Sequence, residues 1–261
     1  MNFYVLMSNL IVLGSKAANP SMWSKFVNFL SSILEGLNSV VHSYGIAVIL
    51  FTVIMRLIIL PLDLKSKKAT MKMNEIQPKL EEINKKYKND PDKRNKKTME
   101  LYQKNKINPL GGCLPLLIQM PLFFALFAAL KQISDFHVQQ KSIESFLWIR
   151  NIWVADSPFV DLYGKSIPLF SANWNGLFIL PILAGITSYY QMKLSSPQSS
   201  SKQKDQMAGF SIIMPLMSVW FCSMYTASFA IYWVASNIFQ IVQQLLYNKK
   251  YSVVKEGADS E

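Results

Sequence analysis

The sequence of 261 residues predicts an all-α polytopic membrane protein with five core transmembrane helices, an outside N-terminus and a cytoplasmic C-terminus. Hydrophobic residues make up 51% of the chain, the mean hydropathy is +0.18, and only 16% of the residues are charged. Long charge-poor runs alternate with strongly basic ones, and five of the charge-poor runs are about long enough to cross ~30 Å of hydrocarbon. The unequal division of Lys and Arg between the two sides then orients the chain.

The charge-poor runs set the order of the elements. The expected spans lie at 44–62, 110–131, 175–193, 208–225 and 227–247. The segments that connect and follow them are a cytoplasmic helical hairpin at 63–109, an extracellular loop region at 132–174, a cytoplasmic loop at 194–207 and a cytoplasmic tail at 248–261. The third and fourth spans are only about 18 residues long, which favours little tilt or a locally thinned bilayer.

Two segments precede the first span. Residues 1–20 contain an apolar core at 3–14 without the positive charges that usually precede it, so we expect a degenerate signal-like or membrane-resting segment. In residues 21–43, apolar side chains recur at steps of three and four, which predicts an amphipathic helix lying in the outer interface. A sixth full span is the weaker alternative, because Ser, Asn and Glu35 line the other face of this helix.

Basic residues indicate which side is cytoplasmic. Of the 27 Lys and Arg residues, 20 fall on the side of the hairpin, the 194–207 loop and the tail, and six fall on the other side. The remaining one, Arg56, lies within a span. By the positive-inside rule the basic side faces the cytoplasm, which an odd number of spans also requires. The net charge of +11 therefore indicates attraction to anionic lipids, and no nucleic acid is expected as a substrate.

The basic hairpin is expected to be helical in both arms. Asn89, Asp90 and Pro91 separate the arms; Asp90 suits an N-cap and Pro91 the first helical position, while Pro78 should kink or divide the first arm. The candidate surface for lipid headgroups, ribosome or nascent chains comprises Lys79, Lys85, Lys86, Lys93 and Arg94. The alternative is a solvated charged loop that only sets topology.

Arg56 is the most informative residue of the first span. A charged group near the bilayer centre costs roughly 2.5–3.5 kcal/mol or more, and the guanidinium does not deprotonate. It must therefore face a polar interior or snorkel to an interface, and its distance from the span ends favours the interior. Spans two to five contain no Asp or Glu. We expect the polar lining around Arg56 to include Gln119, Gln191, Tyr232, Trp233 and Asn237.

No pattern of an enzyme is present. The sequence contains no catalytic triad, HExxH, Walker loop or GxGxxG, and His42 and His137 stand alone. Cys113 and Cys222 lack metal-ligand spacing and are expected to be packing residues, so neither a metal nor a cofactor is predicted. An anion transporter would be expected to show inverted repeats, which we do not find, and an intramembrane enzyme would need a paired nucleophile and base.

One sequence block closely resembles a known signature. NPLGGCLPLLIQMPLFFALF, at 108–127, is similar to the signature of the YidC family of membrane protein insertases, in its compact Gram-positive form. The arginine-bearing span, the hairpin and AIYWVASNIFQIVQQ at 230–244 resemble the same family. This resemblance implies a hydrophilic groove enclosed by the five spans, open to cytoplasm and lipid, in the bacterial cell membrane. It further implies that Arg56 attracts acidic residues of a substrate tail, which crosses without ATP.

The resemblance also implies partners, although this sequence differs from the family pattern at some positions. Its expected partners are nascent membrane proteins and anionic lipids. The ribosome, the signal recognition particle system and the Sec translocon are further partners that it suggests. Many members carry Pro-Ala-Gly before the last span, where this chain has Thr226-Ala-Ser-Phe229, so the turn between the last two spans is expected to differ. The family's large periplasmic domain and long basic tail are not seen, which makes ribosome contact through the tail less expected.

Overall fold

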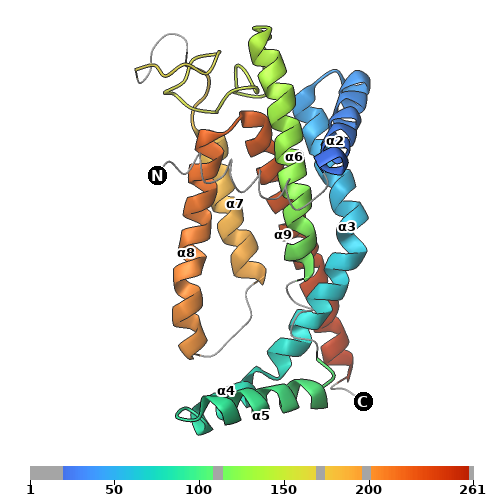
Figure 1. Ribbon diagram of the computed structural model, residues 1–261, viewed down its shortest axis with the longest axis vertical. Helices are drawn as coiled ribbons and strands as arrows, with labels where there is room; N and C mark the ends of the chain where they lie inside the picture. Colours follow the sequence, from blue (N-terminus) through green and yellow to red (C-terminus); the bar gives the residue numbers. More distant parts are fainter. Residues whose placement is uncertain (1–19, 108–113, 169–173, 196–200, 259–261) are drawn as a thin grey trace. The chain divides into compact units, whose positions relative to one another are not determined.

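The computed structural model describes residues 20–107, 114–168, 174–195 and 201–258, and the 1–19 part of the predicted signal-like segment lies outside them. Within these residues every regular element is a helix, with isolated β-bridges only, which confirms the all-α class (Figure 1). The helices are α2 (Pro20–Val41), α3 (Tyr44–Glu75), α4 (Gln77–Lys86), α5 (Pro91–Lys104), α6 (Leu114–Gln139), α7 (Ile179–Ser195), α8 (Ser201–Met224) and α9 (Ala227–Ala258).

The chain divides into two compact units, which are described separately. The bundle unit comprises Met1–Arg56, Pro121–Ser195 and Ser211–Glu261. The hairpin unit comprises Leu57–Met120 and Ser196–Phe210. Helix α3 runs without interruption from the first unit into the second, past Pro61, so the first span and the beginning of the expected hairpin arm form one helix.

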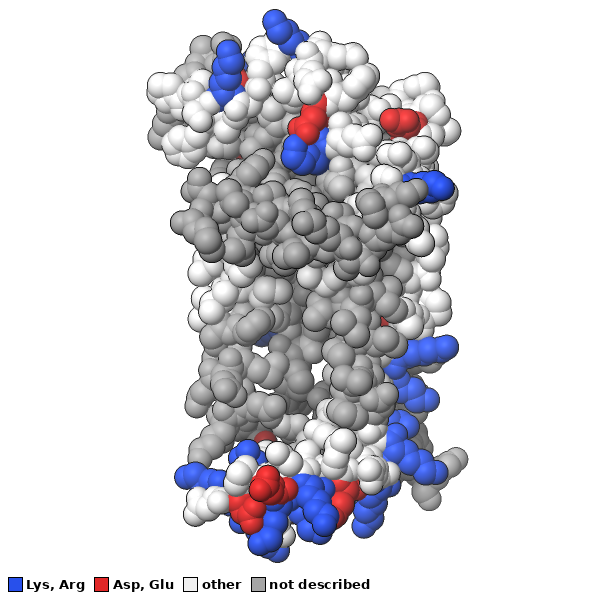
Figure 2. Space-filling model, viewed as in Figure 1, with Lys and Arg blue, Asp and Glu red and all other residues white. Residues whose placement is uncertain are grey.

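The hairpin unit contains α4 and α5 lying side by side (Figure 1). Helix α4 begins after Ile76 with Pro78 in its first turn, so this proline marks a boundary as predicted. Asp90 caps α5 by accepting a hydrogen bond from the backbone N–H of Lys93 at 3.1 Å, and Pro91 occupies the first turn. Lys and Arg side chains gather over both helices, with Asp and Glu among them (Figure 2).

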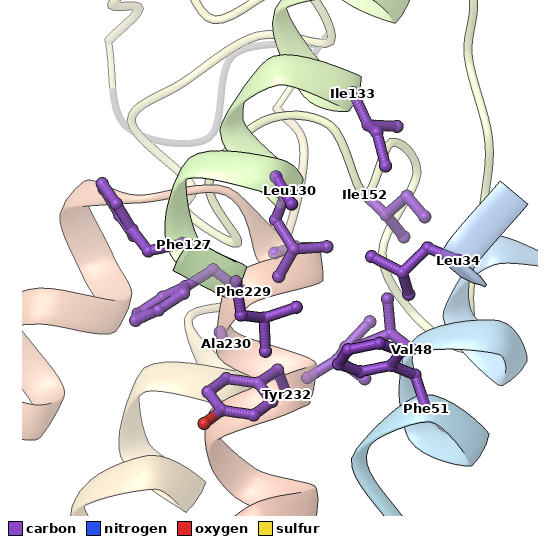
Figure 3. Packing of buried hydrophobic residues seen from close by; sticks show 14 of the residues in the cluster. Leu34, Val48, Phe51, Phe127, Leu130, Ile133, Ile152, Phe229, Ala230 and Tyr232 are labelled. Atoms are coloured by element: carbon purple, nitrogen blue, oxygen red, sulfur yellow. The ribbon is translucent and has the colours of Figure 1, made fainter. Parts of the chain in front are cut away.

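The core of the bundle unit is formed by α2, the first part of α3, α6, α9 and the segment between α6 and α7, with further buried residues from α7 and α8 (Figure 3). Leu34 of α2, Phe51 of α3, Leu130 of α6 and Phe229 of α9 are all nearly inaccessible to solvent. Ile152 of the connecting segment is buried in the same cluster. Close packing here replaces contacts with lipid tails, since apolar side chains gain dispersion energy from dense neighbours.

Helix α2 carries apolar side chains on two faces. Val27, Leu30 and Leu34 are buried in the core, whereas Phe29 and Val40 are exposed. The apolar residues whose spacing suggested an amphipathic helix therefore also pack into the core of the bundle unit. Its position in the outer interface stays a prediction.

Two helices among the described residues are long and apolar enough to cross a membrane: Tyr44–Met73 and Ala227–Lys249. Ile212–Met224 is a shorter apolar segment. Helix α7 has 17 residues, which is about 25 Å at ~1.5 Å per residue and somewhat less than ~30 Å of hydrocarbon. The number of five spans and their sidedness stay predictions.

The turn between α8 and α9 is held by hydroxyl groups. The hydroxyls of Thr226 and Ser228 lie 2.9 Å apart, and the carbonyl of Thr226 accepts from the N–H groups of Phe229 and Ala230 at 3.0 and 3.2 Å. Thr226 thus immediately precedes α9, at the place where related sequences were expected to carry Pro-Ala-Gly.

Candidate functional site

Arg56 lies in α3 with only 7% of its surface exposed. Its Nε donates to the hydroxyl oxygen of Ser236 on α9 at 3.2 Å, and its Nη2 donates to the same oxygen. A hydroxyl satisfies guanidinium donors without neutralising the positive charge. Ser236 therefore supports the guanidinium in the bundle unit through a neutral acceptor.

The residue after Ser236 faces a different helix. Asn237 donates through Nδ2 to the hydroxyls of Thr187 and Ser188 on α7, at 3.1 and 2.9 Å. Trp233, one turn earlier on α9, donates through Nε1 to the same Ser188 hydroxyl at 3.2 Å. Consecutive positions of a helix point about 100° apart, so α9 presents one polar group to α3 and the next to α7.

These contacts continue into a polar seam between helices. Ser188 donates to the Ser218 hydroxyl of α8 at 2.9 Å, and Gln191 donates through Nε2 to Oε1 of Gln240 at 3.3 Å. We define the polar seam as Thr187, Ser188, Gln191, Ser218, Trp233, Asn237 and Gln240. Each hydrogen bond between membrane helices contributes on the order of 0.6 kcal/mol, so the seam joins α7, α8 and α9 by several modest interactions.

The residues predicted to line the site fall into three places. Gln191, Trp233 and Asn237 come together in the polar seam of the bundle unit. Tyr232 is buried in the aromatic core, with its ring centroid 6.2 Å from that of Phe229. Gln119 is half-buried and belongs to the hairpin unit.

Four hydroxyl residues of the site were missed from the sequence: Thr187, Ser188, Ser218 and Ser236. Small hydroxyl side chains are common in apolar helices, where they are easily read as packing residues. Helical spacing offered a signal, because Ser236 is one turn from Tyr232 and one turn from Gln240. Ser188 is similarly placed about one turn before Gln191.

The basic residues predicted on the hairpin lie on its surface. Lys79, Lys85, Lys86 and Lys93 are exposed, and Arg94 is half-buried. Hydrogen bonds from Lys93 hold the pKa of Asp90 below its ordinary value. The hydrogen bond and charge of Glu100 raise the pKa of Lys97, whose ammonium lies 2.6 Å from the carboxylate. These residues therefore present a cationic surface, on which Asp90 and Glu100 are each paired with a neighbouring lysine.

No group of three or more His, Cys, Asp or Glu side chains that could hold a metal ion occurs in the described ranges. Cys222 is a free, buried thiol, in line with its expected packing role.

The region that carries the site is similar to known proteins. Residues 36–255 match the family model described as 60Kd inner membrane protein. The membrane protein insertase YidC of Clostridium tetani is 36% identical over 232 residues, covering 88% of this chain and 92% of that protein. The YidC of Caldanaerobacter subterraneus is 37% identical, covering 87% of this chain and 96% of the relative.

Other relatives are longer. The YidC of Geobacter metallireducens is 37% identical, and the match spans 82% of this chain but 35% of that protein. A solved structure, an active YidC insertase with its first transmembrane domain resolved, is similar with a TM-score of 0.54 and 26% identity. That match covers 85% of this chain and 45% of the solved chain. The chain therefore belongs to the YidC family of inner-membrane proteins, which are membrane protein insertases and not enzymes.

Proposed function

We propose that this protein moves short hydrophilic tails of nascent membrane proteins across the membrane and releases their hydrophobic segments into the bilayer, without ATP. The observation that carries the proposal is the burial of Arg56 in an apolar helix, with the neutral hydroxyl of Ser236 as an acceptor. Relatives named as insertases cover almost the whole of this chain, which supports the general activity.

The proposed chemistry is a transient charge-assisted contact. An Asp or Glu carboxylate of the client tail accepts two parallel hydrogen bonds from a guanidinium, and such bonds are roughly twice as strong as neutral ones. A carboxylate therefore competes well with the Ser236 hydroxyl for the same donors. Because Ser236 carries no charge, it does not hold the guanidinium against this competition.

The polar residues around Arg56 are proposed to admit water. A wetted groove shortens the hydrocarbon path that a polar tail must cross, because polar groups then leave water over a smaller distance. We propose Gln191, Tyr232, Trp233 and Asn237 as its lining in the bundle unit, and Gln119 as a separate water-accessible position in the hairpin unit. In a cysteine-free background, single cysteines at Gln119, Gln191 and Trp233 should react with a polar thiol reagent added from the cytoplasmic side only.

The hairpin surface is proposed to receive clients before they reach the groove. Its lysines suit the anionic headgroups of the cytoplasmic leaflet, at about 1 kcal/mol for each basic residue near the surface. Ribosomes, the signal recognition particle system and the Sec translocon are further proposed partners of this face.

Reconstitution tests the proposed function. Purified protein in liposomes, without nucleotide, should insert a single-span client with a short acidic tail, and Arg56→Ala should abolish this insertion. Lys165→Ala is a control that also removes a cation, since the Lys165 side chain is exposed and the contacts of this residue to Asp161 are made by its backbone. Uptake of a small anion without insertion, or full insertion by Arg56→Ala, would overturn the proposal.

A further inference from the structure

The segment between α6 and α7 makes hydrogen bonds to the first turns of three other helices. Oε1 of Glu144 accepts from the backbone N–H of Tyr44, the first residue of α3, at 2.6 Å. The two carboxylate oxygens of Asp156 accept from the N–H groups of Phe178 and Leu180 at the start of α7, at 3.2 and 2.7 Å. One short stretch of chain thus carries a carboxylate to each of two helix ends.

The third helix is held by backbone carbonyls of the same stretch. The carbonyl of Val154 accepts from the N–H of Ala227 at 2.8 Å, and the carbonyl of Ile152 accepts from Ser228 at 3.0 Å. The first N–H groups of a helix have no partner within the helix and are costly to bury unpaired. Residues 144–156, which we call the capping segment, therefore meet this need for α3, α7 and α9 together.

The capping segment is itself held rigidly. Oδ1 of Asn175 accepts from the N–H of Asn151 at 2.7 Å, and Nδ2 of Asn175 donates to the carbonyls of Asn151 and Ala155 at 2.8 and 2.9 Å. Asn175 and Asp156 are completely buried. A Cβ at Gly176 would lie 1.9 Å from Oδ1 of Asp156, so only glycine lets this carboxylate reach α7.

The three capped helices are the ones that carry most of the site. Arg56 belongs to α3, Ser188 and Gln191 to α7, and Ser236 and Asn237 to α9. Arg56 lies about 18 Å along α3 from its capped first residue, at ~1.5 Å per residue. A slip of one turn between helices moves side chains by about 5.4 Å, which is more than any hydrogen bond of the seam tolerates. The axial positions of the helix ends therefore decide whether the site forms.

We propose that Glu144 and Asp156 are positioning residues for insertion. Through the capping segment they hold the N-terminal ends of α3, α7 and α9 in register, and this register places Arg56 against Ser236 and α7 against α9. The register is a property of the fold alone, whereas its effect on insertion rests on the proposed function.

Cross-linking measures the register directly. In a background with Cys113→Ser and Cys222→Ser, the pair Ser188→Cys and Asn237→Cys reports on α7 against α9, because these side chains touch at 2.9 Å. Asp156→Leu should lower the cross-linking yield about fivefold, the effect expected from loss of one helix cap. For α3 against α9, Arg56→Cys and Ser236→Cys are bridged by a bifunctional thiol reagent, and Glu144→Leu should lower that yield similarly.

Matched variants separate capping from general damage. Glu144→Gln keeps an acceptor oxygen at the end of α3 and should restore the yield, and Asp156→Asn keeps one of two acceptors and should give an intermediate value. Asp161→Leu is the control within the same connection, because the carboxylate of Asp161 accepts from its local neighbours Tyr163 and Lys165, at 2.9 and 2.8 Å. Equal losses for Asp161→Leu and Asp156→Leu would overturn the proposal.

Insertion assays then test the link to Arg56. If Glu144 acts by placing Arg56, the cost of Arg56→Ala should shrink in the Glu144→Leu background, so the two effects should not add. Additive losses, or lost register with unchanged insertion, would overturn the positioning role. Absence of insertion in the unmodified protein would instead contradict the proposed function, and the cross-linking yields would remain informative.

Discussion

The guanidinium of Arg56 on α3 donates to the hydroxyl of Ser236 on α9, 180 positions later in the chain. This contact joins the membrane-buried charge to the helix that also carries the polar seam. The hydroxyl is a neutral acceptor, so under the proposed function a client carboxylate would gain a stronger contact by taking the hydroxyl's place. The predictions below follow from this exchange and from the helices that position it.

Replacing Arg56 with Lys should keep much of the insertion activity. Positive charge is what attracts an acidic tail, and a lysine ammonium retains it while losing the planar fork. Arg56→Gln keeps polarity without charge and should insert poorly. The initial rate for an acidic-tailed client in liposomes compares the two variants. If Lys fails as badly as Gln, charge attraction is not the basis of the contact.

An acid at position 236 should inhibit insertion. Ser236→Asp places a carboxylate beside the guanidinium within the chain, and a buried pair of this kind competes with the client carboxylate for Arg56. Ser236→Asn has the same shape without the charge and serves as the control, with insertion close to that of the unmodified protein. Equal rates for the two variants would show that Arg56 does not need to exchange partners.

Loss of the Ser188 hydroxyl should destabilise the bundle unit. This hydroxyl donates to Ser218 and accepts from Trp233 and Asn237, so Ser188→Ala removes three interhelical bonds. At on the order of 0.6 kcal/mol for each bond, the free energy of unfolding should fall by about 2 kcal/mol. Thermal unfolding in detergent measures this, with the exposed Ser195→Ala as control. Equal melting temperatures would mean that the seam adds no stability.

Acidification should destabilise the fold through His137. Its imidazole stacks on Trp153 with ring centroids 4.3 Å apart, and burial lowers its pKa from the ordinary 6.5 although the charge of Glu35 acts in the opposite direction. The unfolded chain therefore binds a proton more readily, so stability falls as pH drops from 6.5 through the lower folded value.

Comparison with His137→Phe isolates this effect, because phenylalanine keeps the stacking and cannot be protonated. The melting temperature of the unmodified protein should fall relative to the variant as pH is lowered below about 6.5. Burial raises the pKa of Glu144, which favours the folded state at low pH and is common to both proteins. Parallel pH curves for the two proteins would contradict the role of His137.

The sequence could predict those parts of the structure that depend on the type or the spacing of particular side chains. The Asp90 cap and the boundary at Pro78 depend on residues with strong local preferences. Composition changes sharply after Leu62, which suggested that the first span ends there and that a separate helical arm follows. Helix α3 instead continues to Glu75, because its backbone hydrogen bonds do not depend on hydropathy and the following lysines are good helix formers.

Other features had weak signals or none. The carbonyls of Ile152 and Val154 hold α9, and a backbone carbonyl is the same whatever its side chain. The pairing of Arg56 with Ser236 required knowing which face of α9 meets α3, and the sequence placed both Tyr232 and Trp233 in the expected lining. The structure pairs Trp233 with Asn237 through Ser188.

The most direct test of the central proposal is a double-mutant cycle between Arg56 and the client tail. Insertion rates are measured for an acidic-tailed client and its Asp→Asn counterpart, each with the unmodified protein and with Arg56→Ala. The proposed contact predicts coupling: Arg56→Ala slows the acidic client strongly and the neutral client little, with an interaction energy of about 0.5–3 kcal/mol. Equal slowing of both clients would contradict a contact between Arg56 and the tail carboxylates.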